Sequence, residues 1–201
     1  MADQKISAMP SASTPLTGAE LVPMVQSGAN VQSTLANFGA YARNTFSNYG
    51  AFEYADGPLT ALANTVATVI LNTTTQSDNV TLGTPASRVV IGVTGVYSVI
   101  ISVQVENTSA NYDEFTLWPA INGTNVANAA SVIAVTEKKG SINGRGILAV
   151  QYTFSFNAGD YLEFKWITNG GTTSIITVPA SLSAPIHPAA AGVILSVIQI
   201  A

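Results

Sequence analysis

The sequence predicts an all-β protein, an antiparallel jelly-roll sandwich of about eight to ten strands, preceded by a small N-terminal segment with an extended stretch and a helix. From residue 51 onwards, apolar and polar residues alternate with the period of two that half-buried strands show. Asn- and Gly-rich stretches, such as 121–123 and 168–171, interrupt this alternation where hairpin turns are expected. Residues 1–50 lack the alternation. We therefore divide the chain into an N-terminal segment, 1–50, and a jelly-roll domain, 51–201.

The first 30 residues do not favour a helix, because prolines and glycines recur in them: Pro10, Pro15, Gly18, Pro23 and Gly28. Residues 20–26 are expected to form a short extended segment. The proline in that segment keeps it from being a central strand, because it has no N–H to donate to a neighbour.

A short amphipathic helix is predicted near 34–48. Ser33 or Thr34 can cap it, and Gly50 can stop it. Apolar and small residues at a 3-4-3-4 spacing fall on one helical face: Leu35, Phe38, Ala42, Thr45 and Tyr49. A helix of this length is marginal alone in water, so its apolar face needs a partner. That partner is its own β domain, two sister helices or another protein.

Strong alternation predicts strands at 95–107, 146–156 and 160–166, and weaker patterns predict strands at 66–71, 88–91, 114–121, 131–136 and 174–178. The last run, 192–200, is apolar at both alternating sets of positions. A strand of this kind is buried on both faces. It is therefore either central in its sheet or covered by a neighbouring subunit.

The chain is unusually poor in charge. Charged residues make up 9% of it and hydrophobic residues 47%, whereas about 25% charged residues is typical of soluble domains. Interface cores are depleted of charge, so this composition favours a protein that hides much of its surface in an assembly. The net charge is −4 and no basic cluster is present, so no nucleic-acid partner is expected.

No chemistry-bearing cluster stands out, and we expect no enzyme activity, no catalytic residue, no cofactor and no metal. There is no cysteine, hence no thiolate nucleophile or disulfide. His187, the only histidine, lies between Pro185 and Pro188 with no carboxylate spaced to orient it as a base. Asp113 and Glu114 would face opposite ways in a strand, so we expect solvated charges there. No apolar run is long enough for membrane insertion, and the N-terminus does not resemble a signal peptide.

Trp118 and its neighbours allow two interpretations. Trp118 is expected on the strand face opposite Phe115 and Leu117. It could fill a trimer interface or the second sheet face. Alternatively, it could belong to a sugar-binding surface, because aromatic platforms beside amides and carboxylates bind glycans. The candidate glycan contacts are Tyr112, Asp113 and Asn111.

Four stretches in order resemble the jelly roll of the complement globular-head and tumour-necrosis-factor superfamily, most closely versions attached to bacteriophage and giant-virus structural proteins. They are "TGVYSVIISVQVEN" (94–107), "TLWPAINGTNV" (116–126), "FNAGDYLEFKW" (156–166) and "GVILSVIQI" (192–200). The resemblance implies a ten-stranded sandwich that forms a homotrimer about a threefold axis. No calcium cluster is evident, so no metal site is carried over. Candidates for the trimer interface are Trp118, Tyr161, Ile194, Ile198 and Ile200.

The opening stretch, "ISAMPSASTPLTGAELVPMVQSGANVQSTLANF" (6–38), resembles the N-terminal segment of many phage tail and head-fibre proteins. The resemblance implies attachment to the particle, with the major capsid protein or a tail or adaptor protein as partner. The anchor candidates are its apolar residues: Ile6, Met9, Leu16, Leu21, Val22, Val25, Leu35 and Phe38.

Together the two resemblances imply a trimeric virion structural protein, assembled in the host cytoplasm. It would be a head fibre, a short tail fibre or a capsid decoration, because the predicted helix leads into the jelly roll with no shaft between. The alternative is a receptor module on the same fold that binds host-surface carbohydrate, since function depends on the site and not on the fold.

Overall fold

Two units make up the chain, residues 1–46 and residues 47–201. The computed structural model describes residues 16–46 and 48–201, with side chains described as far as residue 41 and again from residue 48. The division falls before the expected boundary at residue 50, because Tyr49 and Gly50 already belong to the first strand of the larger unit. Each unit is described by itself.

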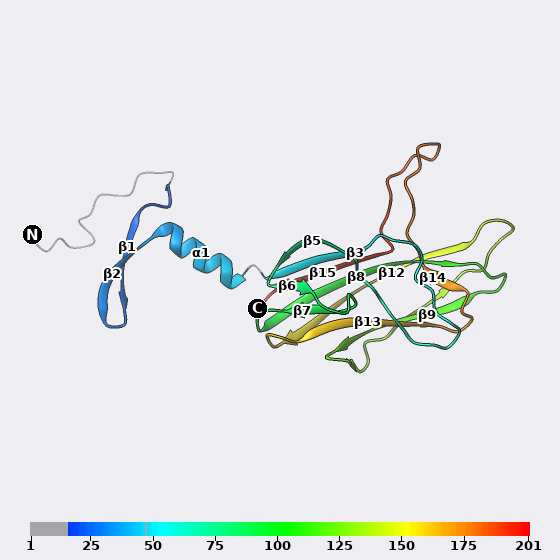
Figure 1. Cartoon of the computed structure of the whole chain (residues 1–201), viewed down its shortest axis with the longest axis horizontal. Coiled ribbons are helices and arrows are strands. Elements are labelled where there is room, and N and C mark those ends of the chain that lie inside the picture. Colours follow the sequence, from blue (N-terminus) through cyan, green and yellow to red (C-terminus); the bar gives the residue numbers. More distant parts are fainter. Residues whose placement is uncertain (1–15, 47) are drawn as a thin grey trace, which may run out of the picture. The chain divides into compact units, whose positions relative to one another are not determined.

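Unit 1 contains a hairpin followed directly by a helix: β1 (Leu21–Gln26), β2 (Ala29–Thr34) and α1 (Leu35–Phe46) (Figure 1). The two strands pair antiparallel from Leu21 with Thr34 to Gln26 with Ala29. Ser27 (φ 51°) and Gly28 (φ 79°) form the two-residue turn, and positive φ at both central positions matches the right-handed twist of the strands. The expected extended segment is therefore half of a hairpin. In a two-stranded sheet both strands are edges, which is where Pro23 is tolerated.

The helix begins where the sequence predicts and ends earlier. The Thr34 hydroxyl accepts a hydrogen bond from the Asn37 N–H at 3.2 Å, which identifies Thr34 as the N-cap. The helix ends at Phe46 and not near residue 48. Tyr49 was predicted on the helical stripe, and this was wrong, because Tyr49 pairs with Ile198 and Asp78 in a sheet. No helix in the described part of the chain is long and apolar enough to cross a membrane.

Unit 2 is a sandwich of two antiparallel sheets (Figure 1). The first sheet has the order β12-β8-β15-β3-β5, with β14 also paired to β8. Its strands are β3 (Tyr49–Tyr54), β5 (Thr73–Asp78), β8 (Gly95–Asn107), β12 (Gly144–Phe156), β14 (Thr173–Ile175) and β15 (Val193–Gln199).

The second sheet has the order β10-β9-β13-β7-β6, with β11 paired to β9 and β4 paired to β13. Its strands are β4 (Ala67–Thr68), β6 (Val80–Leu82), β7 (Val89–Ile91), β9 (Asp113–Ile121), β10 (Thr124–Asn125), β11 (Ser131–Val135) and β13 (Tyr161–Thr168). The predicted antiparallel sandwich is confirmed. The strands predicted at 66–71 and 174–178 shorten to β4 and β14, and β3, β5, β6 and β10 were not predicted as strands.

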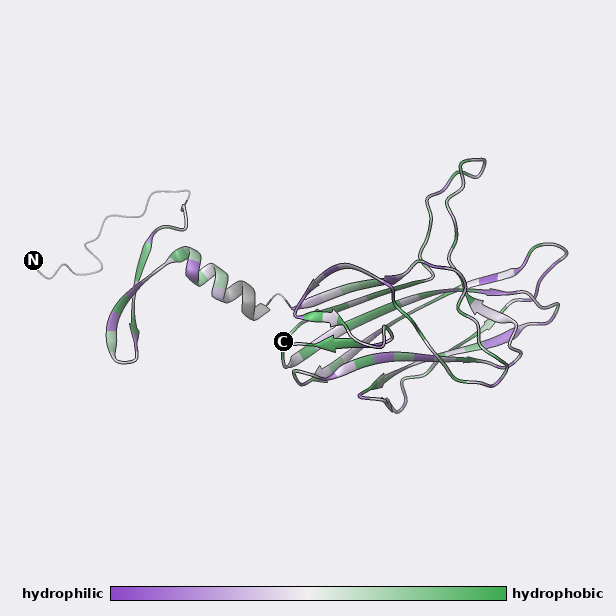
Figure 2. Cartoon of the chain, viewed as in Figure 1, coloured by the Kyte–Doolittle hydropathy of each residue, from purple (hydrophilic) through white to green (hydrophobic). Residues whose placement is uncertain are grey.

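The core lies between the two sheets and is made by the alternation that the sequence displays. In β8 the odd-numbered apolar residues from Tyr97 to Val105 are at most 1% exposed. Trp166 of β13 is fully buried and stacks on Phe115 with ring centroids 5.5 Å apart. Figure 2 shows that hydrophilic segments gather in the loops and at strand ends, whereas much of the length of the strands is apolar.

The last strand is central, as one of the two predicted alternatives requires. β15 lies between β8 and β3. Its residues Val193, Leu195 and Val197 are buried in the core, whereas Ile194 and Ile198 point away from it and are 50% and 48% exposed. Within a single chain, therefore, only one face of β15 is buried, and the predicted burial of both faces does not occur.

The chain enters and leaves unit 2 at the same end. The backbone N–H of Gln199 donates to the carbonyl of Asn48 at 2.9 Å, and the side chains of these two residues are hydrogen-bonded to each other. β8 runs from this end, where Gly95 pairs with Phe156, to the far end, where Asn107 pairs with Gly144 and Thr173. The loops between the far ends of the strands are thus remote from the end at which unit 1 is joined.

Candidate functional site

In the described part of the opening stretch, residues 17–20 form a turn that caps the following helix. The carboxylate of Glu20 accepts hydrogen bonds from the Thr17 N–H (2.7 Å), the Thr17 hydroxyl (2.8 Å) and the Gly18 N–H (2.7 Å). These bonds, led by that from the Thr17 backbone, lower the pKa of Glu20 to about 2. The turn that they close directs the carbonyls of Gly18 and Glu20 at Ala36 and Leu35, whose N–H groups donate at 2.8 and 2.9 Å. The turn therefore satisfies two of the helix donors that would otherwise lack partners.

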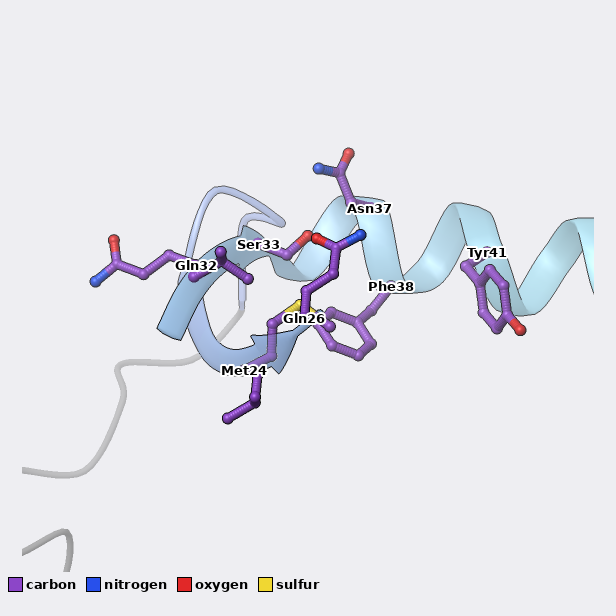
Figure 3. A pocket seen from close by; sticks show the side chains of 9 residues that line it. Met24, Gln26, Gln32, Ser33, Asn37, Phe38 and Tyr41 are labelled. Atoms are coloured by element: carbon purple, nitrogen blue, oxygen red, sulfur yellow. The ribbon is translucent and has the colours of Figure 1, made fainter. Parts of the chain in front are cut away.

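A groove of about 450 Å³ separates the hairpin from the helix in unit 1. We call it the anchor groove, and its lining residues are Met24, Val25, Gln26, Val31, Gln32, Ser33, Asn37, Phe38 and Tyr41. In Figure 3, Phe38 and Tyr41 project from the same side of α1, and Met24 and Gln26 come from the hairpin. Apolar and polar side chains from both the hairpin and the helix thus line the groove.

Unit 1 has no closed core in its described part. Among residues 16–41, none is fully buried. Leu16, Leu21 and Val25 are 50%, 61% and 69% exposed, and Phe38 is 39% exposed. A small unit that leaves such residues in water cannot gain much stability from apolar burial.

The eight anchor candidates fall as follows. Leu16, Leu21 and Val25 are exposed, Val22 and Leu35 are half-buried, and Phe38 lines the groove. Ile6 and Met9 lie outside the described residues. Met24 and Val31 were not among the candidates, although both line the groove. Val31 stands between polar Asn30 and Gln32, and this local contrast was the signal that could have identified it.

A second surface lies on the outer side of the first sheet in unit 2. We call it the isoleucine face, and it comprises Ile100, Ile147, Ile194 and Ile198 with the small residues Ser98, Ser102, Ala149 and Ser196. The four isoleucines are 44%, 66%, 50% and 48% exposed, in that order. Neighbouring strands place each isoleucine of β15 opposite a serine of β8: Ile194 with Ser102, and Ile198 with Ser98. Ile100 is therefore the diagonal neighbour of Ile194 and Ile198, with serines between them, whereas Ile147 lies farther along β12, opposite Gln104.

The isoleucine face itself carries no charge. Charged side chains begin only at its margins, with Glu53 on β3 and with Arg145 and Glu106, which are paired at 2.8 Å. The face thus consists of branched aliphatic and small hydroxyl residues together with two amides, Gln151 opposite Ile100 and Gln104 opposite Ile147, and it is bounded by charge. Ile100 and Ile147 were not predicted as interface residues, although their outward positions follow from the strand period.

The five candidates for the trimer interface do not come together. Ile194 and Ile198 belong to the isoleucine face, and Ile200 lies just beyond β15 and is 59% exposed. Trp118 and Tyr161 lie on the outer side of the opposite sheet, where Trp118 is paired with Lys165. The structure therefore divides these candidates between the two outer faces of the sandwich.

The opposite face carries an ion pair beside Tyr161. The guanidinium of Arg88 lies 4.2 Å from the centre of the Tyr161 ring, and it forms an ion pair with Glu163 at 3.3 Å. These contacts give Tyr161 a role within its own sheet. Trp118 is half-buried beside them and faces away from Phe115 and Leu117, as predicted.

The three glycan candidates do not form one exposed surface, because Tyr112 is exposed and Asp113 is buried. The prediction that Asp113 is a solvated charge was wrong. Tyr112 is 72% exposed, whereas Asp113 is 2% exposed. Its carboxylate accepts hydrogen bonds from the N–H groups of Gly170 (2.7 Å), Thr172 (3.2 Å) and Thr173 (3.1 Å). The carbonyl of Asn111 accepts a hydrogen bond from the Asn107 side chain. Asp113 is thus used inside the protein and presents no free carboxylate to a sugar.

Within the described residues, no group of three or more His, Asp or Glu side chains is placed to hold a metal ion. His187 lies in a loop, with its Nδ1 3.0 Å from the carbonyl of Pro188. Asp160 stabilises its turn, because it accepts hydrogen bonds from the Asn157 N–H and the Asn122 side chain.

No family model matches the sequence, and no curated protein matches it. Among solved structures, the chain is similar to Eiger TNF from S. frugiperda, with a TM-score of 0.52 and 13% identity over 78% of this chain and 94% of that chain. At this identity the likeness concerns the fold alone. The predicted jelly roll is confirmed: the chain has a TNF-like jelly-roll fold, preceded in sequence by a hairpin and one short helix.

Proposed function

We propose that this protein is a trimeric structural protein of a bacteriophage virion. Unit 1 attaches it to the capsid or tail, and the jelly roll projects as a head fibre, short tail fibre or capsid decoration. The observation that carries the proposal is the anchor groove. The residues that resemble phage attachment segments converge on one small unit that caps its own helix and has no buried residue among 16–41. The role is mechanical and requires no enzyme chemistry.

Attachment through unit 1 follows from the exposed apolar side chains. A virion protein that covers Leu21, Val25 and Phe38 removes apolar surface from water, at about 25 cal/mol per Å². The polar residues that line the groove, which include Gln26 and Asn37, can pair with backbone groups of a bound segment.

Trimerisation is supported by the isoleucine face. Three copies related by a threefold axis could bury this face and close the assembly, because a cyclic arrangement leaves no copy of it in water. The uncharged composition removes the cost of burying unpaired charge at such an interface.

Sedimentation of the full-length protein at micromolar concentration tests trimerisation. We expect a trimer for the wild type and monomers for Ile194→Glu, since three carboxylates would be forced into an apolar interface. Val132→Glu is the matched control: Val132 is 54% exposed on β11 of the other sheet, so this variant should remain trimeric. A monomeric wild type would defeat the proposal.

Incorporation of full-length variants into phage particles tests the anchor. Phe38→Ser should reduce the copies bound per particle by about tenfold or more, which is the loss expected for an apolar anchor residue at an interface. Ala40→Ser changes an exposed helix residue that does not line the groove and should incorporate normally. If the two variants are incorporated equally, the proposal that unit 1 attaches the protein to the particle is wrong.

A carbohydrate-binding role is the weaker candidate. It would rest on the exposed Tyr112 alone, since the carboxylate beside it is engaged by the 170–173 turn.

A further inference from the structure

A hairpin-like arm interrupts the jelly roll between β14 and β15, and we call residues 177–191 the arm. It stands out from the sandwich (Figure 1). Four backbone hydrogen bonds hold its two limbs together, two between Val178 and Ala190 (3.0 and 2.8 Å) and two between Ser181 and His187 (2.9 and 3.2 Å). At its base, the side chain of Gln104 donates to the carbonyl of Ala191 at 2.7 Å.

The tip of the arm exposes two large apolar side chains. Leu182 is 93% exposed and Ile186 is 76% exposed. An isolated two-stranded ribbon is at best marginally stable in water, and these side chains contribute nothing to it while they remain in solvent. The arm therefore has the features of a segment whose exposed apolar side chains pack against a partner.

The composition of the arm restricts what the partner can be. From residue 177 to residue 191 there is no Asp, Glu, Lys, Arg, Asn or Gln. A glycan-binding loop needs amide or carboxylate groups to satisfy sugar hydroxyls, and a nucleic-acid-binding loop needs cations. Pro179, Pro185 and Pro188 restrict the backbone of the arm, which lowers the entropy cost of docking. The matching surface is apolar and uncharged.

We infer that the arm of one copy packs on the isoleucine face of a second copy, with Leu182 and Ile186 among its isoleucines. Arm and face are both uncharged, and each chain supplies one of each, so every copy in a ring gives an arm to one neighbour and receives an arm from the other. Each limb spans roughly 20 Å at about 3.3 Å per residue, which is close to the width of a five-stranded sheet with strands about 4.8 Å apart. The inference rests on the proposed trimer and assigns to it an arm-exchange contact.

A hollow on the receiving sheet adds a place for the tip. Gln104, Val105, Arg145, Gly146, Ile147 and Ile176 surround a space of about 280 Å³. Arg145 is the charged residue of this lining, and it is already paired with Glu106 at 2.8 Å. Ile147 borders this hollow and belongs to the isoleucine face. An aliphatic side chain of the arm would cover Ile147, the most exposed of the four isoleucines.

Cysteine cross-linking tests the contact directly, since the chain has no cysteine of its own. The full-length variant Leu182→Cys with Ile147→Cys is treated with a short bis-maleimide and run on a denaturing gel. We expect covalent dimers and trimers. The control, Leu62→Cys with Ile147→Cys, uses a 78% exposed leucine on the loop between β3 and β4 and should yield mainly uncross-linked chain. A product confined to single chains, or equal yields from the two variants, would overturn the inference.

Dissociation provides the second measurement. Leu182→Ser with Ile186→Ser should raise the dissociation constant of the assembly by about tenfold or more, while the folded monomer keeps its circular dichroism. If the wild type is a monomer, the proposed function fails along with the arm contact. If the wild type is a trimer and the double variant dissociates as the wild type does, the arm inference alone is wrong. Particles that then lose host adsorption would identify the arm as a receptor loop.

Discussion

Asp113 shows how one buried carboxylate can organise the end of a jelly roll. It lies at the start of β9 and accepts hydrogen bonds from Gly170, Thr172 and Thr173 in the turn that leads into β14. The Thr172 hydroxyl also donates to the side chain of Asn107, at the end of β8. Three segments distant in sequence are thereby joined. Burial alone would raise the pKa of Asp113, but the hydrogen bonds from Gly170, Thr173 and Thr172 outweigh it, and the pKa falls below its ordinary value.

Replacing Asp113 by Asn should lower the free energy of unfolding at neutral pH by about 2 kcal/mol, because hydrogen bonds to a charged group are lost and an amide faces backbone donors. Urea unfolding measures this loss. Since the folded pKa is depressed, the stabilisation is present above the pKa of the unfolded carboxyl and is lost as the pH falls through the folded pKa. The difference between wild type and variant should therefore shrink on acidification.

Asp56→Asn is the control for this prediction, since Asp56 lies exposed in a loop. It should leave the free energy of unfolding nearly unchanged at neutral pH. An Asp113→Asn protein as stable as this control would show that the carboxylate does not tie the loops together.

At the level of elements, β12 depends on the absence of a side chain at one position. A Cβ at Gly144 would overlap the carbonyl oxygen of Thr136, which is backbone and cannot move aside. Two residues along the same strand, a Cβ at Gly146 would meet only Val105 and Ile133 side chains, at 3.6 and 3.8 Å. The first glycine allows a close backbone approach, and the second does not need to be glycine.

Gly144→Ala should therefore destabilise the jelly roll by about 3 kcal/mol or more, because the clash displaces either β12 or the segment before it. Gly146→Ala should be neutral or slightly stabilising, since alanine loses less conformational entropy than glycine on folding. Thermal unfolding of the two variants side by side makes the comparison. If the Gly144→Ala and Gly146→Ala proteins have the same thermal midpoint, the close approach of Gly144 to the Thr136 carbonyl is contradicted.

At the level of the whole molecule, the exposed isoleucines link folding to assembly. Anything that binds the folded state raises its apparent stability by mass action. If three copies bury the isoleucine face, the folded trimer is favoured over unfolded chains as the protein concentration rises.

The thermal midpoint of the full-length protein should accordingly increase with protein concentration. Ile194→Glu, as a monomer, should melt at one temperature across the same range, and Val132→Glu should follow the wild type. Calorimetry over a hundredfold range of about 1 to 100 μM measures this. A wild-type midpoint independent of concentration would place the isoleucine face outside any stable interface.

The sequence by itself determined the class of fold and the inward faces of the long strands. The odd-numbered residues of β8 from Tyr97 to Val105, and Phe164 and Trp166 of β13, are in the core because a period of two allows no other arrangement on a half-buried sheet. It also narrowed the N-cap of the helix to Ser33 or Thr34, because capping is a local interaction, and the structure identifies Thr34. It did not reveal β5, whose residues from Thr73 to Asp78 carry no apolar alternation and are held by pairing with β3.

Only the tertiary structure decided which candidate residues share a surface. Asp113 was grouped with Tyr112 as a glycan contact because the two are neighbours in sequence. The turn at 170–173, some 60 residues away, buries the Asp113 carboxylate instead. Trp118 and Ile194 both point outward, and the sheet order separates them onto opposite faces. The anchor groove, the isoleucine face and the arm depend in the same way on which strands are neighbours. Strand neighbours in an antiparallel sandwich are set by long-range pairing, and local sequence patterns carry no record of it.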